Sequence, residues 1–144
     1  MKKHWWSLFF IAAFCLSFIG GPNTSLGNGE KVYIVPIHND VEKGLANFLT
    51  RAIETAEEDG AEAIIFDINT PGGAVDAADE IGQAFAETDI KTVAFIDNRA
   101  LSAGAFISLN ADEIYMVPGA TMGAAAVITS DGNAADEKAQ SYWL

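Results

Sequence analysis

The groups that could carry out chemistry in this chain are one serine hydroxyl and two candidate bases. Ser102 is predicted to begin a helix, and the alanines and glycine that follow it are too small to shield its hydroxyl. A serine hydroxyl is a weak nucleophile and needs an adjacent base before it can attack a carbonyl carbon. His38 follows the first predicted strand, and Lys138 lies in a polar C-terminal stretch. A lysine acts as a base only after it loses its proton, which burial away from water favours, so both bases stay open.

Two consecutive glycines, Gly72 and Gly73, follow a predicted buried strand and precede a predicted helix. Without side chains, their N–H groups could approach a developing oxyanion closely, as acyl transfer requires. The N–H group of Ala103 could donate to the same oxyanion as Gly73. Two simpler interpretations stay open, because the glycines could form only a tight turn and Ser102 could only cap its helix.

A third cluster of small residues runs from Thr121 to Ala126 and includes Gly123 and Ala124. Small side chains here would allow a strand and a helix to pack closely. They would also suit the wall of a cleft along which a peptide backbone lies. The cluster therefore adds a candidate substrate-binding segment to the serine and the glycines.

The charge and the histidine content exclude some classes of function. The 144-residue chain has a formal net charge of −12, and leaving out the two lysines of its N-terminal leader changes −12 to −14. A domain this acidic repels the phosphates of nucleic acids. The only histidines are His4 and His38, which argues against a metal centre built on histidine ligands. We therefore predict no nucleic-acid partner and no metal.

Residues 1–27 have the pattern of a secretory leader. Two lysines precede a 15-residue apolar run from Trp5 to Ile19, and Ser25-Leu26-Gly27 fits a cleavage site. The run is short for a membrane span, which needs about 20 residues. We expect a signal peptide or an uncleaved membrane anchor, and a buried core helix is a third possible interpretation. The first two place residues 28–144 outside the cytoplasm. The only cysteine, Cys15, lies in this leader, so the remaining domain has no thiol nucleophile.

The elements that must position these groups alternate between strands and helices. Strands are predicted where β-branched and aromatic residues gather, and helices where apolar residues recur at i, i+3, i+4 and i+7. The predicted strands span 31–37, 63–68, 92–96, 113–117 and, as a further short strand, 124–129; the predicted helices span 41–58, 74–87 and 102–110, with 97–101 as a connection. This alternation predicts an α/β domain with a parallel sheet, whose sites lie at the carboxyl ends of the strands.

Taken in order, Thr70-Pro71-Gly72-Gly73, Ser102-Ala103-Gly104-Ala105, the segment 116–125 and Lys138 resemble the NfeD-type membrane-bound serine proteases. This family has a Clp/crotonase-like fold and is related to signal peptide peptidase A. The resemblance covers the chain from about residue 31 to its end, and the order and spacing of three motifs make it specific. It implies a Clp/crotonase-like layered fold with a mainly parallel sheet and flanking helices.

The resemblance also implies roles for residues and partners. Family members act outside the cytoplasm, associate with membranes, self-associate as homo-oligomers and need no metal, cofactor or ATPase. Their plausible substrates are peptides and apolar segments of membrane proteins, such as stomatin-like proteins. By resemblance, the nucleophile is Ser102, the general base is Lys138, the oxyanion hole contains Gly72, Gly73 and Ala103, and the substrate-binding segment contains Gly123 and Ala124.

Family members usually continue well past the lysine, so we expect residues 28–144 to be part of a Clp-like protease domain. Two other functions stay open. A crotonase-like enzyme would use paired N–H groups to hold a thioester enolate, with Asp67 or Asp76 as its carboxylate base. A non-catalytic interaction module of the same fold would bind a membrane partner or self-associate without cleaving anything.

Overall fold

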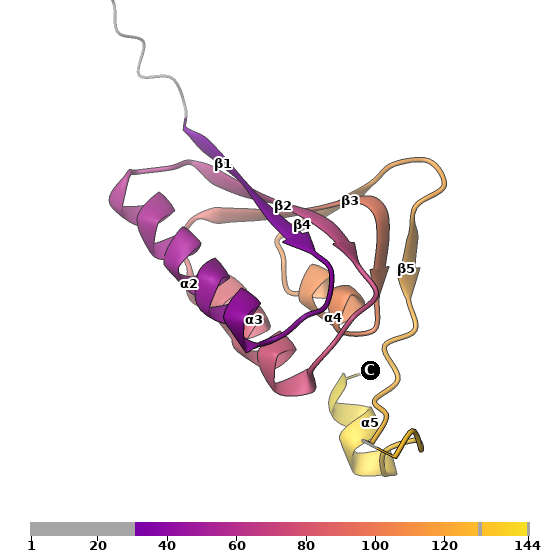
Figure 1. Ribbon diagram of the computed structural model, residues 1–144. Coiled ribbons are helices and arrows are strands. Elements are labelled where there is room, and N and C mark those ends of the chain that lie inside the picture. Colours follow the sequence, from indigo (N-terminus) through magenta and orange to yellow (C-terminus); the bar gives the residue numbers. More distant parts are fainter. Residues whose placement is uncertain (1–30, 130, 144) are drawn as a thin grey trace, which may run out of the picture.

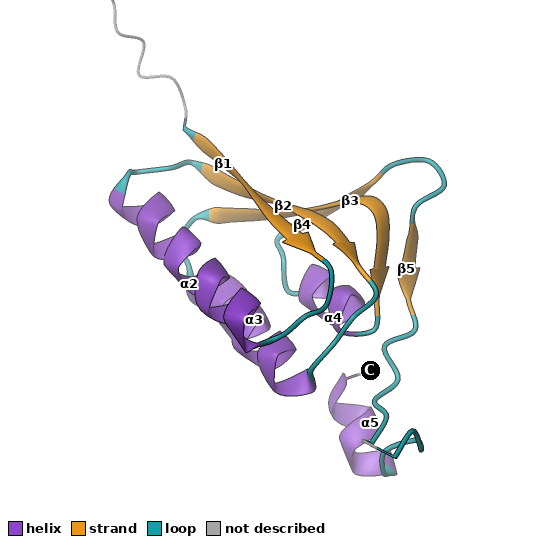
Figure 2. Cartoon of the chain, in the orientation of Figure 1, coloured by secondary structure: helices purple, strands orange, loops and turns teal. Residues whose placement is uncertain are grey.

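The computed structural model describes residues 31–129 and 131–143, so the predicted leader at 1–27 lies outside the described residues. Strands and helices alternate along the chain, as the sequence predicts (Figures 1 and 2). In chain order the elements are β1 (Val32–His38), α2 (Lys43–Glu58), β2 (Ala63–Thr70), α3 (Val75–Glu87), β3 (Lys91–Leu101), α4 (Ala103–Leu109), β4 (Glu113–Met116), β5 (Thr121–Gly123) and α5 (Glu137–Trp143). Within the described ranges, none of the helices has the length and apolar character of a membrane span.

The described strands form one parallel sheet in the order β1-β2-β3-β4, and β5 pairs with the last residues of β3. Connections between parallel strands of one sheet cross over in a right-handed sense. Since the strands follow one another across the sheet in chain order, the connecting helices are expected on the same face. Figure 1 shows the consequence, since α2, α3 and α4 all lie on one face of the sheet. The predicted α/β architecture, a mainly parallel sheet with flanking helices, is confirmed.

The core lies between that face of the sheet and the helices. In β2 every second side chain is buried, from Ile64 to Thr70, because alternate residues of a strand point to opposite faces. α2 and α3 each turn an apolar stripe toward the sheet, as their residue spacing predicts. Phe66 of β2 stacks on Phe85 of α3, with ring centroids 4.0 Å apart. This packing holds the carboxyl ends of the strands together at one edge of the domain.

β3 differs from the prediction, because it continues to Leu101 where the sequence predicts a connection after Ile96. Its register with β2 shifts after Ile68, so that Thr70 pairs with Ala100. The three polar residues that follow Ile96 are exposed and form the irregular part of the ladder. Such a bulge bends a strand, and Figure 1 shows the bent end of β3 running beside β5.

The C-terminal part also differs from the prediction. The short strand is β5 rather than the segment 124–129, because Ala124 adopts a positive φ of 57°, which ends the extended backbone. Helix α5 has no counterpart among the predicted elements. Figure 1 shows α5 standing apart from the α/β body, beyond the end of β5.

Candidate active site

Ser102 lies at the sharp turn between β3 and α4. Its backbone has φ 51° and ψ −116°, a conformation that residues other than glycine adopt at a cost. The Ser102 N–H donates to the Gly123 carbonyl at 2.8 Å, and the Ser102 carbonyl accepts from the Ala105 N–H at 3.0 Å. The Ser102 side chain makes no capping hydrogen bond, so the N-cap interpretation does not describe it. A strained strand-to-helix turn that leaves a serine hydroxyl unused is typical of a nucleophile.

Backbone strain is concentrated around this turn. Among the described residues other than glycine, those with positive φ are Asn39, Ser102 and Ala124. Each directly follows a strand, namely β1, β3 and β5. Strained conformations persist only where surrounding contacts enforce them, and they gather at functional sites. The strain therefore marks the carboxyl edge of the sheet, where a parallel α/β fold is expected to bind its ligands.

The glycine pair lies against Ser102 on one side and against the β1–α2 loop on the other. A Cβ atom on Gly72 would lie 2.7 Å from the Cβ atom of Ser102. The φ angle of Gly72 is 110°, which also favours glycine. A Cβ atom on Gly73 would overlap the backbone of Val41. Both glycines therefore allow close approach of other segments, which a simple tight turn does not require.

The two glycine N–H groups have different surroundings. The Gly72 N–H, a predicted oxyanion donor, is already engaged in this structure, because it donates to the Thr70 hydroxyl at 3.0 Å. Val41 and Gly73 form a parallel bridge, in which Val41 bonds to the residues on either side of Gly73. The N–H of Gly73 itself therefore points away from Val41. Within the described part of the chain, neither this N–H nor that of Ala103 has an acceptor.

A small cavity of about 50 Å³ brings these groups together, because Gly73, Ser102 and Ala103 all line it. The rest of its wall is apolar and consists of Val75, Ala125, Ala126, Val127 and Ile128. Sequence patterns pointed to the small residues at 125 and 126, whereas nothing in the sequence signalled Val75, Val127 or Ile128. One cavity, partly walled by apolar side chains, thus holds a serine hydroxyl and two N–H groups that have no hydrogen-bond partner among the described residues.

Gly123 and Ala124, the predicted substrate-binding residues, lie directly before this cavity wall at the end of β5. The carbonyl of Gly123 holds the N–H of Ser102, as described above. A Cβ atom on Gly123 would meet nothing within 4 Å, so close packing of a strand and a helix does not explain this glycine. The two residues position the serine and the start of the wall, while the next residue, Ala125, begins the lining itself.

Lys138 and Ser102 line different pockets, so the structure does not bring the predicted pair together. Lys138 is exposed on α5, and its pocket is shared with acidic side chains of the same segment. The burial that a neutral lysine base requires is therefore not present at this position.

α5 is nevertheless attached to the cavity wall. An antiparallel bridge joins Ile128 to Ala134, which precedes α5 in the chain. The Val127 carbonyl accepts the Ala135 N–H at 3.0 Å and the Gln140 side-chain amide at 3.2 Å. Val127 lines the Ser102 cavity, so the helix that carries Lys138 is connected to that cavity through one residue.

The other candidate bases lie elsewhere. His38 Nε2 is 3.1 Å from Asp67 Oδ2, and His38 lines a separate open pocket of about 620 Å³. Asp76 pairs with Lys43 at 3.4 Å on an exposed surface. His38, Asp67 and Asp76 are absent from the lining of the Ser102 cavity, so its geometry favours neither a histidine base nor the carboxylate base of a crotonase-like reaction. The described residues contain no group of three or more His, Cys, Asp or Glu side chains that could hold a metal ion.

Comparisons of sequence identify relatives of the whole described domain. A family model described as the N-terminal domain of NfeD1b matches residues 31–144. The chain is 47% identical over 134 residues to the membrane protein NfeD1b of Bacillus subtilis, which covers 93% of this chain and 31% of that protein. It is 35% identical over 96 residues to the membrane-bound protease PH1510 of Pyrococcus horikoshii, covering 65% of this chain and 22% of that protein. The chain thus spans less than a third of the length of these curated relatives.

Comparisons with solved structures point to the same group of proteins. A serine-to-alanine mutant of the 1510-N membrane-bound stomatin-specific protease matches with a TM-score of 0.71 and 32% identity, over 77% of this chain and 57% of that one. The lysine-to-alanine mutant of that protease, solved in complex with a substrate peptide, matches equally well over 54% of its chain. A ClpP1 mutant from Listeria monocytogenes matches with a TM-score of 0.53 and 26% identity, over 54% of this chain and 46% of that one. These similarities confirm the predicted family resemblance and the Clp-like fold.

Proposed function

The chain belongs to the family of NfeD1b N-terminal domains, and on that premise we propose that it is a serine endopeptidase with a Ser102–Lys138 dyad. Relatives named as membrane-bound proteases support a peptidase role. The observation that carries the proposal is the unused hydroxyl of the strained Ser102, which shares one cavity with the free N–H groups of Gly73 and Ala103.

The chemistry follows from these groups. The Ser102 oxygen bonds to the substrate carbonyl carbon while its proton passes to the neutral amine of Lys138. The carbonyl oxygen becomes an oxyanion, which accepts hydrogen bonds from Gly73 and Ala103. The C–N bond then breaks, and the departing amine takes the proton from Lys138. Water, deprotonated in turn by Lys138, attacks the acyl-serine ester and releases the carboxylic acid and the free hydroxyl.

The dyad requires α5 to approach the cavity from its position in the structure. The Gln140–Val127 hydrogen bond supports this requirement, because it already attaches α5 to a residue of the cavity wall. A shift of α5 over the apolar residues 125–128 would bury the Lys138 amine and remove it from water. Burial of that kind favours the neutral amine that a general base needs.

The cavity also supports a substrate class. Its volume of about 50 Å³ and its alanine, valine and isoleucine lining suit a small apolar side chain. Within the described residues the Gly73 carbonyl accepts no backbone hydrogen bond, so it is free to accept an N–H group of an extended peptide. We therefore propose apolar segments of membrane-associated proteins as substrates, with stomatin-like proteins among them, since 1510-N is named as stomatin-specific. We further propose that the domain acts outside the cytoplasm, anchored or secreted through its leader, and works as a homo-oligomer.

A second candidate function is a non-catalytic interaction module of the same fold. The observation that favours it is the exposure of Lys138 on a helix that stands apart from the α/β body. In that case the cavity would bind a peptide without cleaving it.

Peptide cleavage distinguishes the two functions. The full chain is incubated with a library of apolar peptides in which the residue before each candidate bond varies in size, and products are mapped by mass spectrometry. The protease proposal predicts cleavage after small apolar residues, lost in Ser102→Ala and in Lys138→Ala. Cleavage that persists in Ser102→Ala contradicts the proposal, and peptide binding without cleavage by the wild type supports the interaction module.

A further inference from the structure

Thr70 is fully buried at the carboxyl end of β2 and has no role in the chemistry described so far. Its side chain contacts three separate segments that surround Ser102. We propose that Thr70 is a positioning residue that aims the Gly73 N–H at the oxyanion. The inference rests on the proposed protease function and adds a residue that does not touch the substrate.

The Thr70 hydroxyl connects the first two segments. It donates to the Asn39 carbonyl at 2.5 Å, in the strained loop after β1. It accepts the N–H of Gly72 at 3.0 Å. A hydroxyl has one proton and can accept as well as donate, so the two bonds are compatible and both are satisfied within the buried site. The hydroxyl therefore fixes the orientation of the Pro71–Gly72 peptide group, which directly precedes the peptide group that carries the Gly73 N–H.

The Thr70 methyl group contacts the third segment. A Cβ atom on Gly104 would overlap the Thr70 Cγ2 atom, so the methyl group packs directly against the first turn of α4. That turn carries Ala103, the second proposed oxyanion donor. One threonine side chain thus sets the distance between the Gly72–Gly73 turn and the start of α4.

This arrangement explains why one donor is consumed and the other is left free. With the Gly72 N–H held by Thr70 and the Gly72 carbonyl held by the Val41 N–H at 2.8 Å, the Gly72 backbone has no freedom to rotate. The next N–H, that of Gly73, is then directed into the cavity. Oxyanion stabilisation depends on donors fixed in place before the reaction, and a misplacement of about 1 Å can cost 100-fold in rate.

The test compares the covalent labelling of Ser102 by a fluorophosphonate probe in variants of the full chain. Thr70→Val keeps the shape of the side chain and removes both hydrogen bonds, whereas Thr70→Ser keeps the hydroxyl. Thr92→Val is the matched control, because Thr92 is 1% exposed and its hydroxyl makes two hydrogen bonds with Asp112, at 2.9 and 3.0 Å. The maximal labelling rate and the probe concentration at half-maximal rate are measured separately, and urea unfolding reports stability.

We expect Thr70→Val to lower the maximal rate by roughly 10- to 100-fold without changing the half-maximal concentration, in line with the loss of a well-placed oxyanion donor. The maximal labelling rate of Thr70→Ser should stay within about threefold of the wild-type rate, since its hydroxyl keeps the hydrogen bonds. Thr92→Val should label at the wild-type rate, although it loses about as much stability as Thr70→Val. Should Thr70→Val fail to fold, Thr70→Cys, with its weaker hydrogen-bonding thiol, replaces it with an intermediate loss expected.

Equal maximal labelling rates for Thr70→Val and Thr92→Val would overturn the positioning role while leaving the protease function intact. A wild type that does not label at all, although folded, would instead remove the protease function and with it this inference.

Discussion

Ser102 is held in a backbone conformation that suits glycine better than serine. Strain of this kind costs about 1–3 kcal/mol, and the Ser102 side chain makes no capping hydrogen bond that would offset it. The strain is instead maintained by the Gly123 carbonyl and by the close contact with Gly72. The surroundings thus hold the hydroxyl at the cavity at the expense of stability, which is the arrangement expected of a nucleophile.

Replacing Ser102 tests this balance directly. Ser102→Gly should raise the free energy of unfolding by roughly 1 kcal/mol, because the relief of strain exceeds the entropy cost of a glycine. It should also abolish probe labelling. Ser102→Ala is the control, because it removes the hydroxyl but keeps the strain, so it should lose labelling with no gain in stability. Urea unfolding of both variants measures the difference, and equal stabilities would show that the turn is not strained.

Gly72 should tolerate no side chain. Gly72→Ala would place a Cβ atom 2.7 Å from that of Ser102, so we expect loss of labelling and a clear loss of stability. Gly119→Ala is the matched control, since Gly119 has a φ of 91° and open space around its Cβ position. It should cost about 1 kcal/mol from its backbone conformation alone and label normally. Normal labelling of Gly72→Ala would show that the contact with Ser102 does not matter.

At the scale of elements, the sequence predicted most of the α/β body. The helices α2 and α3 and the buried strand β2 follow from apolar spacing, because burial against a sheet imposes a period on the sequence. The second half of β3 could not be predicted in this way. Its polar residues 97–99 are typical of a connection, and the segment is a strand because residues 99–101 pair with β5 and Ala100 pairs with Thr70 of β2.

The candidate site was only partly predictable for the same reason. Ser102 and the two glycines carry a local signal in their small, consecutive residues. The role of Thr70 in holding the Gly72 N–H depends on a loop 31 residues away in sequence, at Asn39, and leaves no trace in local patterns. The attachment of α5 to the cavity wall likewise depends on contacts between distant residues, because the Ala135 N–H and the Gln140 side chain both donate to the Val127 carbonyl.

That contact gives a prediction about α5. Gln140→Ala removes one of the two hydrogen bonds to the Val127 carbonyl and should slow peptide cleavage several-fold, because the helix that carries Lys138 is held less firmly at the cavity wall. The stability of the α/β body should not change, since α5 stands apart from it. Gln83→Ala, at an exposed position on α3, is the control. Cleavage and thermal unfolding are measured together, and unchanged cleavage in Gln140→Ala would argue against a catalytic role for α5.

The contact between Thr92, near the start of β3, and Asp112, just before β4, gives a prediction about how stability depends on pH. The backbone N–H and hydroxyl of Thr92 donate to the Asp112 carboxylate and hold the pKa of Asp112 below its usual value. When folding lowers the pKa of a carboxyl group, the group stabilises the folded state at pH values above its pKa in the unfolded chain, about 3.9 for Asp. This stabilisation is lost as the pH falls through the pKa of the folded state. Asp112→Asn should therefore be less stable than the wild type at pH 7, and the gap should close below about pH 4. Urea unfolding between pH 7 and pH 3 checks this, and a constant gap would contradict it.

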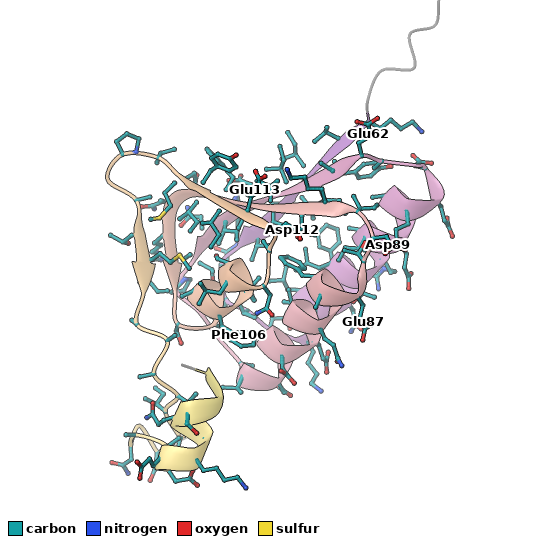
Figure 3. The ribbon with its side chains drawn as sticks, turned by 180° about the vertical axis from the view of Figure 1, so that it is seen from behind. Glu62, Glu87, Asp89, Phe106, Asp112 and Glu113 are labelled. Carbon is teal, nitrogen blue, oxygen red and sulfur yellow. The ribbon has the colours of Figure 1, made fainter. Side chains whose placement is uncertain are left out.

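At the scale of the whole molecule, one group of acidic side chains lies at the opposite end of the sheet from the candidate site. Figure 3 labels Glu62, Asp89, Asp112 and Glu113, which lie at or just before the starts of β2, β3 and β4. The Ser102 cavity lies at the opposite, carboxyl ends of the strands and is lined by uncharged residues. A cavity lined by uncharged residues on an acidic domain fits the proposed apolar peptide substrate, and the net negative charge disfavours the binding of nucleic acid.

The net charge of −12 also predicts how salt affects stability. Like charges on a compact domain repel one another, and salt screens this repulsion. Raising sodium chloride from about 10 to 500 mM at pH 7 should therefore raise the thermal midpoint by roughly 3 °C. Near pH 4, where about half of the carboxylates are protonated, the same change should have a smaller effect. A midpoint that falls with salt at pH 7 would mean that ion pairs outweigh the repulsion.

The most direct measurement is to react the folded, full chain with a fluorophosphonate probe and to locate the modified residue by mass spectrometry. An activated nucleophile at the cavity predicts modification of Ser102 alone, with no adduct on the buried Ser108 or the exposed Ser141, and a much slower reaction in Lys138→Ala. A folded chain in which Ser102 stays unmodified, or reacts no faster than Ser141, would contradict the assignment of Ser102 as the nucleophile.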